Sequence, residues 1–135
     1  MNDLQKNYEA KISLLKEARL QILRLHKLLI DLERSDFETE NGQISSSQFL
    51  NLLLNERNFQ WLRRFSTLIV DIDEMLDLDD GYTEDMIEKY IAQIRKLVNF
   101  DSGDDEFAVK YKNYLQINPD VAVKHSEIRK LLGGK

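Results

Sequence analysis

The chain has 135 residues, the length of one domain and enough to bury a hydrophobic core without disulfides or metals. Apolar residues make up 42% of it and charged residues 32%, a composition that excludes a disordered chain. The formal net charge of -5 argues against a general nucleic-acid binder, and the absence of cysteine excludes disulfides, thiolate catalysis and cysteine-ligated zinc.

The sequence also bears on location. The first residues, MNDLQKNYEAKIS, lack the short apolar core of a signal peptide. No stretch approaches the roughly 18 apolar residues of a membrane span. We therefore expect a cytoplasmic protein that does not enter the membrane.

A long helix is predicted from about Asn2 to Arg34, because apolar residues recur there at helical spacing. This stripe consists of Leu4, Tyr8, Ile12, Leu15, Ile22, Leu25, Leu29 and Leu32. A helix of about 30 residues is longer than a compact small domain is high, so we expect its first turns to project or to pair with another subunit. The polar segment Ser35–Gln43 is predicted to be a loop.

A second, short helix is predicted over Ser46–Asn55. Ser45 and Gln48 have the spacing of a capping box, and Ile44 and Phe49 that of a hydrophobic staple. After a polar break at residues 55–58, the densest apolar run in the chain predicts a central helix from Phe59 to Leu78.

Three further helices are predicted after the acidic turn Asp79-Asp80-Gly81. Thr83 is a candidate N-cap for the first, which carries an apolar stripe from Met86 to Val98. An acidic loop at residues 101–105 precedes a short aromatic helix, and Asn118-Pro119 opens the last helix. The sequence therefore predicts a single all-α domain over residues 1–135, a helical bundle of about six helices with the short C-terminal ones packed on it.

Asp73 is a polar residue inside the apolar arc of the central helix, with Ser66 one heptad earlier on the same line. We expect Asp73 to be at least partly buried and therefore paired. Arg19 and His26 lie on or beside the inward face of the long helix, together with Glu33, and His125 is a third candidate partner. The cluster of Asp73, Ser66, Arg19 and His26 is either a small ligand site or an ion pair that fixes the helix register.

No metal site or cofactor is predicted. His26 and His125, the two histidines, belong to no zinc or di-iron spacing. The run Asp77–Gly81 resembles a calcium loop, but its glycine falls one position too early for an EF-hand. We interpret it as a solvated acidic turn.

A candidate binding surface consists of Trp61, Arg63, Arg64 and Glu74 on the central helix. Arginines near the start of this helix and acids near its end reverse the preference of the helix dipole, which suggests that the charges face partners. Together with Arg63 and Arg64, Arg57 forms a small basic spot on this surface. Tyr111 and Tyr114 with Lys110 and Lys112 form either an aromatic nucleic-acid surface or, as we favour, core packing with a lysine rim.

The segment Phe59–Glu74 has the pattern F-x-W-L-R-x-x-S-x-L-I-V-x-I-D-E. It resembles a motif of a family of small all-helical bacterial proteins of unknown function. Later pieces, Asp105-Glu106-Phe107 with Tyr111 and Pro119-Asp120-Val121, extend the resemblance to roughly residues 26–132. The resemblance implies a helical fold and a bacterial source but no chemistry. It puts Trp61, Arg63, Ser66, Asp73 and Glu74 at motif positions.

Three functions remain open from the sequence, which contains no P-loop, nucleophile elbow or zinc-protease motif. The preferred one is a non-catalytic protein-protein interaction or regulatory module, with a protein partner or self-association. The first alternative is a small-molecule binder or unrecognised enzyme with a polar pocket around Asp73. The second is a nucleic-acid-associated protein, which the net charge disfavours.

Overall fold

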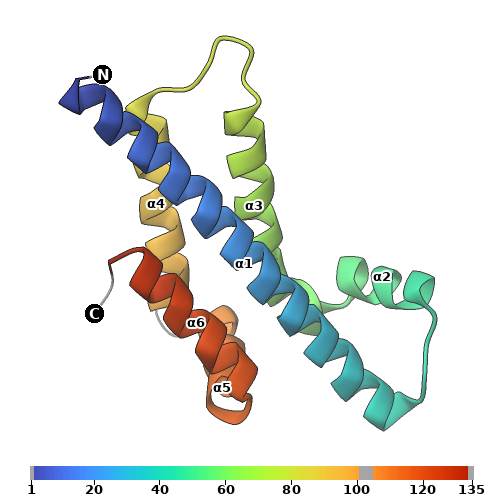
Figure 1. Ribbon diagram of the computed structural model, residues 1–135. Coiled ribbons are helices and arrows are strands. Elements are labelled where there is room, and N and C mark those ends of the chain that lie inside the picture. The colour runs from blue at the N-terminus through green and yellow to red at the C-terminus, as the bar shows by residue number, and fades with distance from the viewer. Residues whose placement is uncertain (1, 101–104, 134–135) are drawn as a thin grey trace.

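The computed structural model describes residues 2–100 and 105–133, and these residues are almost entirely helical. One long helix, α1 (Asp3–Asn41), runs the length of the molecule, and the other elements follow it in the chain (Figure 1). In chain order they are α2 (Ser46–Asn55), the 3₁₀ helix η1 (Arg57–Leu62), α3 (Arg63–Leu76), α4 (Glu84–Asn99), α5 (Glu106–Ile117) and α6 (Pro119–Leu131). The predicted all-α class and the six α-helices are confirmed.

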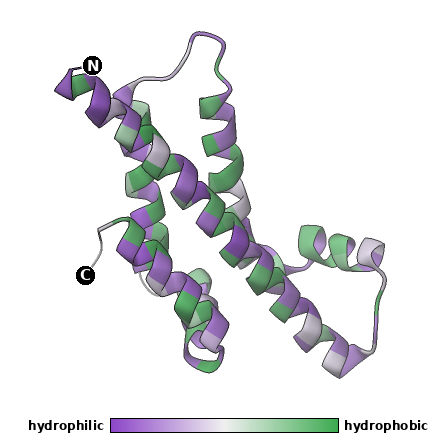
Figure 2. Cartoon of the chain, in the orientation of Figure 1, coloured by the Kyte–Doolittle hydropathy of each residue, from purple (hydrophilic) through white to green (hydrophobic). Residues whose placement is uncertain are grey.

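The core lies where α1 meets α3, α4 and α6, with α5 closing one end. The inward stripe of α1 is completely buried and consists of Leu15, Ala18, Ile22, Leu25 and Leu29. Figure 2 shows apolar residues recurring along α1 between hydrophilic ones, as the periodicity predicts. α3 and α4 are joined by the loop at residues 77–83 and run antiparallel, so the start of α3 lies beside the end of α4 (Figure 1).

α1 is longer than predicted, because the polar segment after Arg34 continues the helix to Asn41. Tertiary contacts explain the difference. The Phe37 ring packs against Phe59 at 6.3 Å between centroids, and Asp36 accepts a hydrogen bond of 2.7 Å from the Tyr114 hydroxyl. Gly42 then ends the helix with a positive φ of 85°.

The first turns of α1 project, one of the two expected arrangements. Leu4 is 80% exposed, whereas the Tyr8 hydroxyl donates to the Tyr82 carbonyl at 3.0 Å. Lys11 forms ion pairs with Glu84 and Glu88 at the start of α4. The helix is therefore attached to α4 from Tyr8 onward.

The predicted central helix begins later than Phe59, because residues 57–62 form the 3₁₀ helix η1 before α3 begins at Arg63. Phe59 packs on Phe37 and Phe49, while Trp61 packs on Tyr114 and Phe107. The tighter winding of a 3₁₀ helix lets these two rings, two residues apart, both enter the interior against different neighbours.

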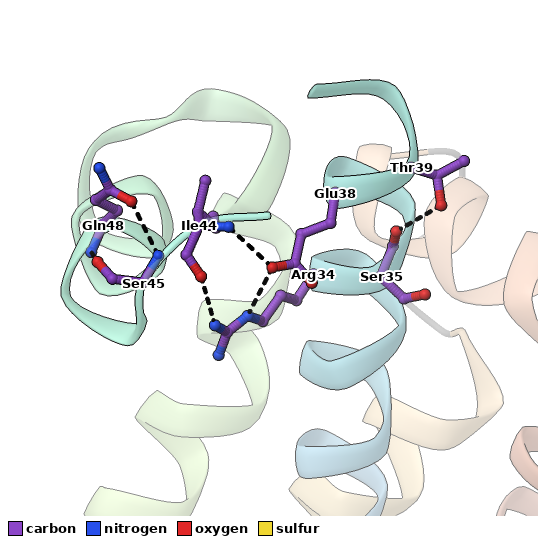
Figure 3. Close-up of polar contacts among 7 residues, drawn as sticks. All are labelled: Arg34, Ser35, Glu38, Thr39, Ile44, Ser45 and Gln48. Atoms are coloured by element: carbon purple, nitrogen blue, oxygen red, sulfur yellow. Dashed lines mark hydrogen bonds and ion pairs between the residues drawn. The ribbon is translucent and has the colours of Figure 1, made fainter. Parts of the chain in front are cut away.

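The connection from α1 to α2 is held by polar side chains (Figure 3). Arg34 donates to the Ile44 carbonyl at 2.8 Å and pairs with Glu38, which accepts from the Ile44 N–H at 3.0 Å. The Ser45–Gln48 capping box is present in both directions, as predicted. The predicted Thr83 and Asn118 N-caps are also present.

Replacing Ser45 by alanine is expected to lower the free energy of unfolding by about 1 kcal/mol, because it removes the acceptor for the Gln48 N–H. Urea unfolding followed by circular dichroism measures the change. Ser47→Ala is the matched control, since Ser47 is an exposed residue inside α2. Equal stability of the two variants would show that the cap contributes nothing.

Candidate functional site

Asp73 lies at the edge of the contact between α3 and α1, not inside it. Its side chain is 47% exposed and accepts two hydrogen bonds from Arg19, of 2.6 Å from Nε and 2.9 Å from Nη2. The prediction that Asp73 is at least partly buried is therefore wrong. Of its three candidate partners, Arg19, His26 and His125, the structure pairs it with Arg19. Phe65, Ile69 and Ile72 occupy the centre of the interface instead.

The structure does not gather the other members of the predicted polar cluster around this pair. The Ser66 hydroxyl donates to the Arg63 carbonyl of its own helix at 3.2 Å. His26 stacks on Phe65 with 5.8 Å between ring centroids, and burial lowers its pKa. We interpret the Arg19–Asp73 pair as a structural link between two helices.

Among the residues that the structure describes, the buried carboxylate is Glu33, which is 8% exposed. Its Oε2 accepts from the Trp61 indole N–H at 3.1 Å, and its Oε1 accepts from the Tyr114 hydroxyl. Burial and the hydrogen bonds to Glu33 and Asp36 raise the pKa of Tyr114. The sequence analysis placed Glu33 beside the inward face but did not connect it to Trp61, although a buried indole N–H requires an acceptor.

Trp61 itself does not belong to a surface, contrary to prediction. It is 4% exposed and stacks on Tyr114 with 6.1 Å between ring centroids. Tyr111 and Tyr114 are buried as well, so core packing is the correct interpretation of that helix. Lys110 donates to the Asn58 carbonyl, and Lys112 lies over the Phe100 ring, which gives the expected lysine rim.

His125 is buried on α6 and shares a hydrogen bond of 2.8 Å between its Nδ1 and the Tyr111 hydroxyl. Burial, with the charge of Arg129 as a second cause, lowers its pKa. It lies against Phe100, whose ring stacks on the imidazole at 5.8 Å. His125 is thus a core residue and has no part in the Asp73 site.

A groove between α3 and α4 is a concave surface that the described residues form. We call it the α3–α4 groove, and its volume is about 560 Å³. Its lining residues are Gln60, Arg63, Arg64, Thr67, Leu68, Asp71, Gln93, Lys96 and Leu97. Leu68 and Leu97 are buried and form its apolar base, while the remaining side chains are polar.

Opposite charges lie toward the two ends of this groove. Arg63, Arg64 and Lys96 come from the start of α3 and the end of α4, and Asp71 lies two turns further along α3. Arg64 pairs with Asp105 and lies over the Phe107 ring, and Arg63 donates to the Leu54 carbonyl. Within residues 2–100 and 105–133, no opposite charge lies at ion-pair distance from Asp71 or Lys96.

Two of the predicted surface residues, Arg63 and Arg64, therefore line the groove, and Glu74 does not. The groove also contains five residues that were not predicted as site residues, namely Gln60, Thr67, Asp71, Gln93 and Lys96. The sequence pattern could have indicated part of the groove, because residues 60, 64, 67 and 71 are three or four positions apart and so lie on one side of a helix. They form a second, polar stripe beside the apolar one.

The described residues contain no group of three or more acidic, histidine or cysteine side chains that could hold a metal ion. No helix among them combines the length and the apolar character that a membrane-spanning segment requires. Comparison of the chain with known protein families, curated proteins and solved structures finds no match. The resemblance of residues 59–74 to a bacterial helical family stays a prediction.

Asp73→Asn is expected to lower the free energy of unfolding by about 0.2–1 kcal/mol, because the Arg19 pair is exposed to solvent. A double-mutant cycle with Arg19→Gln isolates the pair energy. Glu74→Gln, on the exposed side of the same helix, is the control. A loss of several kcal/mol would contradict a surface pair and indicate a buried one.

Stability is expected to decrease as the pH falls below the ordinary histidine pKa of 6.5, because the pKa values of His26 and His125 are lowered in the fold. The unfolded chain then binds more protons than the folded chain. Urea unfolding at about pH 7 and about pH 5.5 measures this slope. His26→Leu, which keeps an apolar contact with Phe65, should reduce it. An unchanged pH dependence of stability in His26→Leu would show that His26 does not contribute to it.

Proposed function

We propose that this protein is a non-catalytic binding module of the cytoplasm, and that the α3–α4 groove holds a segment of a partner protein. The observation that carries the proposal is the lining of the groove, where polar side chains lie around an apolar base. The amide groups of Gln60 and Gln93 each offer donors and an acceptor. They match the alternating N–H and C=O groups of an extended peptide backbone.

The dimensions of the groove agree with this ligand. From Gln60 to Asp71 the helical rise amounts to about 15–18 Å, which is the length of about five extended residues. Leu68 and Leu97 give an apolar side chain of the ligand a surface to contact. Such a segment would be bound by main-chain hydrogen bonds and recognised through its side chains.

A small-molecule ligand is the second candidate, in this groove and not around Asp73. The volume of about 560 Å³ falls within the range of ligand pockets. Asp73, by contrast, is engaged by Arg19 at the surface and does not line the groove.

Lys96→Glu is the variant that tests the proposal. It reverses an exposed charge at the rim of the groove. We expect the tagged wild-type protein to capture a partner from its native lysate, and the variant to lose that partner. Mass spectrometry of the captured proteins measures the difference.

Lys130→Glu is the matched control. Lys130 and Lys96 both lie in the last turn of a helix, so both substitutions put an acid at the unfavourable end of a helix dipole. Only Lys96 lines the groove. A partner that both variants lose or both retain would show that the groove is not the binding site.

A further inference from the structure

Both signs of charge lie inside the α3–α4 groove. Its basic end holds Arg63 and Lys96, and its other end holds the half-buried carboxylate of Asp71. Arg64 is also at the basic end, where Asp105 neutralises it. A ligand with one kind of charge would satisfy one end and be repelled by the other.

The basic end keeps donors for a ligand. One nitrogen of Arg63 donates to the Leu54 carbonyl, and a guanidinium carries five N–H donors in all. Lys96 is exposed and has no carboxylate at ion-pair distance within the described residues. A ligand carboxylate placed between Arg63 and Lys96 would receive charge-assisted hydrogen bonds from both sides of the groove.

The acidic end of the groove offers a carboxylate to a cation of the ligand. Asp71 is half-buried against the groove, and no described cation pairs with it. A partly desolvated carboxylate without a partner is stabilised by a cation that a ligand supplies. The Asp71 carboxylate would thus bind an ammonium or guanidinium group.

The distance between the two ends sets the spacing of the ligand charges. Arg63 and Asp71 are eight residues apart on α3, which corresponds to about 12 Å along the helix axis. In an extended strand, side chains four positions apart lie on the same face and about 13 Å from each other. Two positions in a strand give about 7 Å, and three positions in a polyproline II segment give about 9 Å, so both fit less well.

We propose that the α3–α4 groove selects an extended peptide segment that carries an acidic and a basic residue four positions apart. The acidic residue binds Arg63 and Lys96, and the basic residue binds Asp71. This inference rests on the proposed function, and it adds the chemistry of the partner segment. It also disfavours a nucleic-acid strand, because a phosphate backbone would place negative charge against Asp71.

The test uses seven-residue peptides with glutamate and lysine four positions apart, in both orders, in a threonine- and alanine-rich background. Binding is measured by amide chemical-shift changes of the ¹⁵N-labelled protein. We expect saturable shifts at Thr67, Asp71, Gln93 and Lys96. Replacing the peptide lysine by glutamate should weaken binding about two- to fivefold or more, since one attractive pair becomes repulsive.

The decisive comparison is between the wild-type protein and a variant in which the charge of a groove residue is reversed. Asp71→Lys should reverse the preference, so that the peptide with two glutamates binds more tightly than the peptide with glutamate and lysine. Glu74→Gln, which alters a carboxylate of the same helix outside the groove, should leave the preference unchanged. Lys96→Glu should weaken binding of both peptides.

Each of the following results would overturn the inference. The first is equal binding of the two peptides by the wild-type protein, or no shift at groove residues with any peptide. The second is a preference that Asp71→Lys does not alter. The third is salt-dependent binding of a single-stranded RNA in the groove in place of peptides. If a captured partner is lost in Lys96→Glu but retained in Asp71→Asn, the proposed function stands and the two-charge ligand is wrong.

Discussion

The fold depends on the apolar stripe of α1, in which Leu15, Ile22 and Leu29 are completely buried at intervals of one heptad. The other α-helices have 10 to 16 residues, a length at which an isolated helix is marginal in water. Their stability must therefore come from packing, and α1 contacts η1, α3, α4 and α6 directly. A single helix of 39 residues, about 58 Å long, is thus the element on which the shorter helices pack.

The α3–α4 groove follows from how these shorter helices divide their surfaces. α3 places Phe65, Ile69 and Ile72 against the core, and a neighbouring stripe with Thr67 and Asp71 against the groove. α3 and α4 are antiparallel, so the basic end of the groove combines the first residues of one helix with the last turn of the other (Figure 1). Of the reversed charges of α3, which the helix dipole disfavours, Arg63, Arg64 and Asp71 line this shared surface, whereas Asp73 pairs with Arg19 of α1.

Local chemistry made much of the fold predictable, because caps act within a few residues of sequence. Ser45, Thr83 and Asn118 mark helix starts where the structure has them. Residues 35–41 have the composition of a loop, and their helix depends on contacts with Phe59 and Tyr114, more than twenty residues away. A helical projection places Asp73 in the apolar arc of the central helix. A projection cannot show where a neighbouring helix crosses, and α1 passes to the side of Asp73, where Arg19 pairs with it. The groove is formed by residues of two helices, so the residue pattern of a single helix could not predict it.

The hydrogen bond from Trp61 to Glu33 has a consequence for how this molecule can be observed. Trp61 is the single tryptophan of the chain, and it lies where η1, α1 and α5 meet. An indole beside a buried carboxylate and a stacked tyrosine has an emission that changes once any of these three elements separates. The intrinsic fluorescence of the protein is therefore a probe of this one junction. A ligand that leaves the emission unchanged while shifting groove amides would act without loosening the core.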